Sequence, residues 1–97
     1  MSIFAVEYVY GPEAEAQRAE HRPRHRVWLQ ELADDGVLVA SGPYLDGAGA
    51  LLIFQAESET ALQEILKQDP ISVGGGVAGL KISAWNPVIG ELRKYMA

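Results

Sequence analysis

Apolar residues gather in four short runs along the chain, and each run predicts a β-strand. The first covers residues 3–10, is rich in aromatic and β-branched side chains, and stops at Gly11-Pro12. It is almost continuously apolar apart from Glu7, which predicts a central strand covered on both faces. The other runs predict strands at residues 37–41, 50–56 and 80–85. The two middle strands are expected to pair as an antiparallel hairpin.

A helix is predicted between the first two strands, and a proline decides where it begins. Residues 13–20 have helix-forming composition, but Pro23 would cost roughly 3 kcal/mol in a helix interior. We therefore place the helix at about residues 22–35, with Pro23 in its first turn, Gly36 as its stop, and only a short turn or loop before it. One face carries side chains at three- and four-residue spacing, namely His25, Trp28, Leu29 and Leu32.

A second helix is predicted after Ser58, which is a good N-cap. Its apolar stripe is formed by Leu62, Ile65 and Leu66. The helix should end before Asp69, because Pro70 disfavours the helical conformation of the residue that precedes it. Residues 71–79 are glycine-rich and predict a loop, and residues 88–95 predict a short terminal helix.

The order of these elements, βαββαβ, predicts a ferredoxin-like α+β fold. Its four-stranded antiparallel sheet carries both helices on one face, and the other face is left bare. An apolar sheet face of this size needs a cover. We therefore predict a single domain over residues 1–97 that forms a homodimer by packing two open sheet faces together.

Composition narrows the classes of function. The 97 residues include no cysteine, which excludes a disulfide framework, a zinc ribbon, an iron–sulfur site and a thiol nucleophile. The formal net charge of -5 argues against nucleic acid as a partner. No apolar run approaches the ~20 residues of a membrane span. The N-terminus lacks the basic segment of a secretory signal, so we expect a cytoplasmic protein with no membrane partner.

Two histidines and one aspartate are the candidates for chemistry. His21 and His25 are four residues apart, a spacing that suits a metal site on a helix, but the predicted helix start places His21 outside it. We expect no metal and no cofactor. His25 and Asp69 should lie near the same sheet edge, because the two helices run antiparallel, and a His held by a carboxylate is an acid/base pair. Periodicity alone favours the structural alternative, a satisfied histidine beside a helix-ending Asp-Pro.

Several short motifs match a known family in order and over nearly the whole chain. They are Arg22-Pro23-Arg24-His25, Leu29, Leu32, Asp35-Gly36-Val37-Leu38, Ser41-Gly42-Pro43, Asp69-Pro70 after a helix, and a closing Ala84-Trp85-Asn86-Pro87. This set resembles the YciI-like (YCII-related) family of small bacterial proteins. The chain departs from the usual pattern in its run of three glycines after Asp69 and in the extra His21.

The resemblance implies a ferredoxin-like fold that dimerises into an α/β barrel, and an active site built on a histidine and an aspartate. By motif these are His25 and Asp69, and Gly42-Pro43 would line the same pocket. The family resembles muconolactone isomerase in fold, and some relatives are dehydrochlorinases of chlorinated hydroxyquinols. Both reactions move a proton on a small oxygenated ring, which suits a histidine base without a metal.

We therefore expect a small-molecule enzyme that carries out isomerisation or elimination, with His25 as general base and Asp69 fixing its tautomer. The expected substrate-binding residues are Arg22, Arg24, Ser41, Gly42 and Pro43. The arginines are equally a candidate solvated face beside acidic neighbours. The alternative function is a non-catalytic homodimeric module that binds a ligand or regulates a partner.

Overall fold

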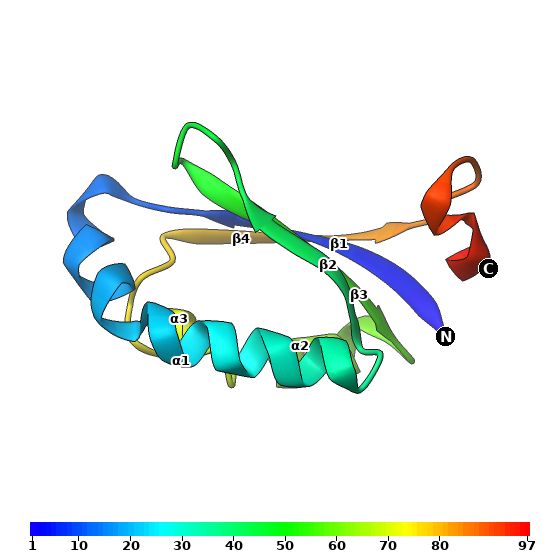
Figure 1. Ribbon diagram of the computed structural model, residues 1–97, viewed down its shortest axis with the longest axis horizontal. Helices are drawn as coiled ribbons and strands as arrows, with labels where there is room; N and C mark the ends of the chain where they lie inside the picture. Colours follow the sequence, from blue (N-terminus) through cyan, green and yellow to red (C-terminus); the bar gives the residue numbers. More distant parts are fainter.

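The computed structural model describes all 97 residues, and its strands form one sheet in the order β2-β3-β1-β4 with antiparallel neighbours. The helices α1, α2 and α3 all lie on one side of this sheet (Figure 1). This arrangement confirms the predicted ferredoxin-like α+β fold. In chain order the elements are β1 (Ser2–Val9), η1 (Pro12–Ala14), α1 (Glu15–Asp34), β2 (Leu38–Pro43), β3 (Gly49–Ala56), α2 (Glu59–Leu66), α3 (Pro70–Val73), β4 (Gly79–Trp85) and η2 (Glu91–Tyr95).

The hydrophobic core lies between the sheet and the helices. Phe4 of β1 and Phe54 of β3 are directly opposite in the register, so both point to the helical side, where both are buried. Leu62 and Leu66 of α2 join the same cluster, which confirms the predicted stripe. The helix α1 packs against α3 and against the edge strand β2. None of the helices combines the length and the hydrophobicity that a bilayer-spanning segment needs.

The sequence prediction for the start of α1 was wrong, because the helix begins at Glu15 and contains Pro23 in its interior. A proline removes one backbone hydrogen bond and crowds the preceding turn, so a helix that continues through it bends. Figure 1 shows the first turns of α1 at an angle to the straight remainder. These turns are anchored by tertiary contacts, since Arg18 is buried there. His21 is therefore helical, and His25 lies in the middle of α1.

Three segments outside the main helices differ from the sequence prediction. Pro70–Val73 forms the one-turn helix α3 where a loop was predicted, and Asp69 is its N-cap. The strand β2 continues through Gly42-Pro43, which is possible because an edge strand tolerates a proline that donates no hydrogen bond. At the C-terminus the 3₁₀ helix η2 covers only Glu91–Tyr95, a shorter segment than the predicted 88–95.

Candidate active site

The side chains of His25 and Asp69 meet although they are 44 residues apart in the sequence. The distance from His25 Nδ1 to Asp69 Oδ1 is 2.6 Å, and the two residues are only 8% and 0% exposed. A carboxylate is a hydrogen-bond acceptor, so His25 Nδ1 carries the proton and donates it. In the neutral ring this leaves a free lone pair on the other nitrogen, Nε2, which is the form of a histidine that acts as a base.

Two further donors hold the Asp69 carboxylate in place. The backbone N–H of Ile71 donates to Oδ1 at 3.0 Å, which is the N-cap bond of α3, and the hydroxyl of Tyr8 donates to Oδ2 at 2.6 Å. Asp69 thus joins β1, α1 and α3 at one point. With its partners in place, this buried carboxylate has both oxygens satisfied.

Tyr8 is a residue of the site that no sequence motif indicated. Burial of the phenol, followed by the nearby Asp69 charge, raises the pKa of Tyr8 far above its usual value, so its hydroxyl stays protonated and acts as a donor. Tyr8 lies on the helix-facing side of the central strand, opposite Ala50. The sequence signal for this role is a tyrosine in a strand that is predicted to be buried, because a buried hydroxyl needs a hydrogen-bond partner.

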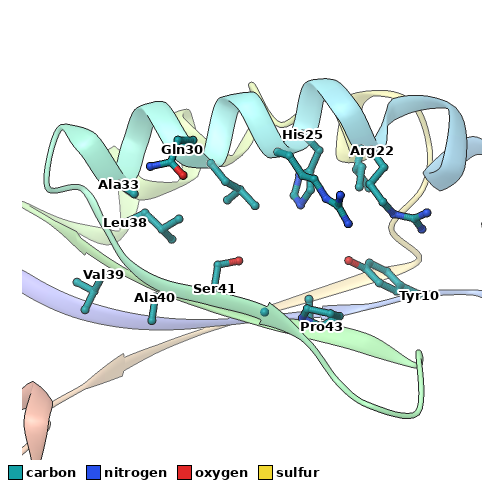
Figure 2. A pocket seen from close by; sticks show the side chains of 15 residues that line it. Tyr10, Arg22, His25, Gln30, Ala33, Leu38, Val39, Ala40, Ser41 and Pro43 are labelled. Carbon is teal, nitrogen blue, oxygen red and sulfur yellow. The ribbon is translucent and has the colours of Figure 1, made fainter.

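A cavity of about 510 Å³ lies beside this pair, between α1 and the strand β2. His25 and Arg22 project into it from α1, and the hydroxyls of Ser41 and Tyr10 point into the same space from below (Figure 2). The predicted residues that line the cavity are Arg22, His25, Ser41, Gly42 and Pro43. Asp69 does not line it, and is connected to the cavity through its hydrogen bond to His25.

Arg24 is the predicted binding residue that does not reach this cavity. Its side chain is exposed and hydrogen-bonds to the Nδ1 atom of His21. Residues two apart on a helix point in different directions, whereas residues four apart share a face. Arg26 is four residues after Arg22 and lines the cavity in place of Arg24. The four-residue spacing of Arg18, Arg22 and Arg26 was the sequence signal for this.

The cavity combines a cationic end with an apolar wall. No acidic side chain lines it, while Arg22 and Arg26 both do. Leu29 and Leu38 contribute apolar surface from the facing elements α1 and β2. Such a site suits a small molecule that has an apolar body and a negatively charged oxygen, with the free nitrogen of a histidine beside it.

The candidate metal site at His21 and His25 finds no third ligand among the surrounding side chains. No group of three His, Cys, Asp or Glu side chains converges in the structure. The Nδ1 atoms of His21 and His25 bond to Arg24 and Asp69, so only the Nε2 atom of each ring is open, and no third ligand joins them. His21 packs closely against Gly74, where an added Cβ would overlap its ring.

Comparisons with known proteins place this geometry in context. The YCII-related domain family model matches residues 3–86. Among solved structures, 5-chloro-2-hydroxyhydroquinone dehydrochlorinase from Burkholderia phenoliruptrix AC1100, in complex with 2,5-dihydroxybenzoquinone, has a TM-score of 0.77 and 22% identity over 87% of this chain and 93% of that one. Muconolactone isomerase has a TM-score of 0.68 and 15% identity over 88% of each chain. An antibiotic biosynthesis monooxygenase has a TM-score of 0.56 and 12% identity over 92% of this chain and 100% of that one.

At these identities, likeness to the solved structures shows a shared fold. A comparison with curated protein sequences finds no match.

Proposed function

The chain belongs to the family of YCII-related domains, and from that premise and the geometry of the cavity we propose that it is an enzyme. It uses His25 and Asp69 as an acid/base dyad for isomerisation or elimination on a small oxygenated ring compound. The observation that carries this proposal is the 2.6 Å contact between His25 Nδ1 and Asp69 Oδ1 beside a cavity.

His25 is the general base in this mechanism. Its Nε2 atom takes a proton from the substrate, and the Asp69 carboxylate stabilises the imidazolium that forms. Asp69 also fixes the tautomer, because its bond to Nδ1 keeps the lone pair on Nε2. A positioned base of this kind contributes about 10²–10⁴-fold in rate. The proton then returns to another carbon in an isomerisation, or a leaving group departs with its electron pair in an elimination.

The cavity residues define the class of substrate. Arg22 and Arg26 hold a negatively charged oxygen, and Ser41 donates or accepts a further hydrogen bond. Two proteins of similar fold support a substrate that is a ring with several oxygens. Their names describe a 5-chloro-2-hydroxyhydroquinone dehydrochlorinase and a muconolactone isomerase. Proton transfer on such rings needs no redox step, so the proposed reaction requires no cofactor.

A homodimer formed through the open sheet face is part of the proposal. Leu51, Val9 and Trp85 lie on the side of the sheet that faces away from the helices and are 40%, 49% and 43% exposed. Glu7, the polar residue on this face of β1, already accepts a hydrogen bond from the Tyr44 hydroxyl at 2.6 Å. A second copy of the sheet would therefore cover apolar surface without leaving this carboxylate unpartnered.

The test is turnover of two candidate substrates, 5-chloro-2-hydroxyhydroquinone and muconolactone, followed by chloride release and by absorbance. We expect His25→Ala to abolish turnover while the dimer survives. His21→Ala is the matched control, since it removes the same side chain from the same helix outside the cavity. It should retain activity. Full activity in the His25→Ala variant would refute the dyad. Loss of activity in the unchanged chain on metal removal, together with an inactive His21→Ala variant, would favour a metal site instead.

A further inference from the structure

Tyr10 carries the one tyrosine hydroxyl in the cavity, and the fold itself does not use it. The hydroxyls of Tyr8 and Tyr44 both donate to carboxylates at 2.6 Å, whereas that of Tyr10 has no hydrogen-bond partner within the chain. Tyr10 follows directly after β1 and lines the cavity. Figure 2 shows its hydroxyl pointing into the space beneath His25 and Arg22. This group is thus available to a ligand that His25 can reach.

A buried arginine holds the Tyr10 ring in this position. The guanidinium carbon of Arg18 lies 4.6 Å from the ring centroid, and Arg18 is only 7% exposed. Its Nη1 atom donates to the carbonyl oxygens of Gly11 at 2.8 Å and Gly76 at 3.2 Å. No carboxylate pairs with Arg18. Its charge is therefore satisfied by backbone dipoles and by the face of the Tyr10 ring.

The glycine run after α3 makes room for this arginine. A Cβ built on Gly76 would lie 2.7 Å from Arg18 Cγ and 2.9 Å from Ile71 Cγ2, closer than packed atoms approach. Gly76 therefore lets Arg18 lie against the loop and reach its carbonyl. The glycine run and the stacked Tyr10 thus belong to one arrangement, which the loop, α1 and the end of β1 build together.

The electrostatic setting keeps the Tyr10 hydroxyl a donor. Burial of the phenol and the charge of Asp69 raise the pKa of Tyr10, while Arg18 and Arg22 oppose this shift only in part. The hydroxyl is thus protonated at neutral pH, in a cavity whose lining charges are cationic. Such a donor is suited to an oxygen that gains negative charge.

We propose that Tyr10 is a catalytic residue whose hydroxyl donates a hydrogen bond to the oxyanion that forms on the substrate, and that Arg18 is its positioning residue. This rests on the proposed function. His25 Nε2 takes the proton as the substrate C–H bond breaks, and the electron pair moves onto the adjacent carbonyl oxygen. Tyr10 keeps its own proton and stabilises that oxygen. When the electron pair returns, the imidazolium gives its proton to carbon or a leaving group departs as an anion.

The first measurement is binding of 4-nitrophenolate, a coloured aromatic oxyanion, by calorimetry and absorbance. We expect Tyr10→Phe to weaken binding about 10-fold or more, the usual effect of losing a hydrogen bond to a charged group. Nitrobenzene, which lacks the oxyanion, should bind equally well to both proteins. Tyr44→Phe is the matched control, since it removes the same hydroxyl from the outer face of the sheet, and should bind the probe like the unchanged chain.

The second measurement tests the positioning role of Arg18. Arg18→Lys keeps the charge but loses the planar stack and the two carbonyl contacts. We expect it to weaken 4-nitrophenolate binding, with a smaller further loss in the Tyr10→Phe background than in the unchanged chain. A purely structural arginine would instead give equal losses in both backgrounds, with a matching fall in melting temperature.

Turnover separates this inference from the proposed function. With an active substrate, Tyr10→Phe should lower kcat about 100-fold with little change in KM. Equal kcat and equal probe binding in Tyr10→Phe would overturn the role of Tyr10 and leave the dyad standing. Weaker probe binding in Tyr10→Phe without turnover in the unchanged chain would support the oxyanion donor and refute the proposed reaction. A chain that neither binds the probe nor turns over would refute both.

Discussion

Asp69 serves the fold and the candidate site with the same two oxygens. It caps α3 by accepting a hydrogen bond from the N–H of Ile71. It also accepts hydrogen bonds from the ring of His25 and from the hydroxyl of Tyr8. Each contact restricts the carboxylate, and together they place the Nδ1 proton of the histidine without any flexible element. A substitution at Asp69 therefore affects stability and chemistry at once. A substitution at His25 isolates the proposed reaction better, because its ring makes a single side-chain hydrogen bond.

The raised pKa of Tyr8 predicts a loss of stability at alkaline pH. Its folded-state value lies above that of the unfolded chain, so the contribution is complete below about pH 10 and is lost as the pH rises above it. We expect the free energy of unfolding to fall by up to about 1.4 kcal/mol per pH unit from this residue. Urea unfolding at several pH values between about 9 and 11 should show that the free energy of unfolding of Tyr8→Phe falls less per pH unit than that of the unchanged chain.

The same variant should begin from a lower stability at neutral pH, since Asp69 loses a donor in a buried site. We expect a cost of about 1–3 kcal/mol. An unchanged alkaline slope in Tyr8→Phe would mean that other groups cause the effect.

At the scale of elements, α1 and the loop after α3 depend on each other. The helix continues through Pro23 and brings Arg18 and His21 against the glycine run. Gly75 has a positive φ of 80°, a conformation that a side chain makes costly. The glycine run, which the sequence pattern predicts only as a loop, is therefore a packing requirement of this chain.

Glycine-to-alanine substitutions in this loop test that requirement. Gly76→Ala should cost about 1–3 kcal/mol of stability, because its methyl group meets Arg18 and Ile71, which are buried. Gly74→Ala should cost less, since the His21 ring it meets is partly exposed and can turn away. Gly42→Ala is the control, because nothing lies within 4 Å of its added Cβ. Urea unfolding should rank the three in this order, and equal values would contradict the packing model.

At the scale of the whole molecule, the helices occupy one face of the sheet and leave the other open (Figure 1). The cavity lies on the helical side, between α1 and β2, so a dimer formed through the other face would not cover it. Assembly and catalysis are then separable by mutation. This separation is what allows the oligomeric state to be tested without loss of the site.

Leu51→Glu should dissociate the proposed dimer, because it places a charge at the centre of the open sheet face. Light scattering after gel filtration should show a monomer that retains its circular dichroism spectrum. Val73→Glu is the control, since this residue is 73% exposed and belongs to α3 on the helical side. A monomeric unchanged chain, or a Leu51→Glu variant that stays dimeric, would rule out this interface.

The sequence by itself determined the four strands, the βαββαβ order, and the pairing of His25 with Asp69 as candidates. Strand periodicity and the Ser58 cap are local signals, and the structure confirms them. The dyad was favoured only by the family resemblance, because periodicity alone preferred a structural histidine. Its contact was still anticipated, since the topology brings those two segments to one edge.

Only the tertiary structure decided which neighbours complete the site. A local rule placed the start of the helix at Pro23, but α1 begins earlier, at Glu15, and the buried contacts of Arg18 offset the hydrogen bond lost at the proline. The phase of α1 then places Arg26 in the cavity and leaves Arg24 outside it. Tyr8 meets Asp69 across 61 residues. Periodicity reports which side of an element is buried, whereas the partner found there depends on how distant elements pack.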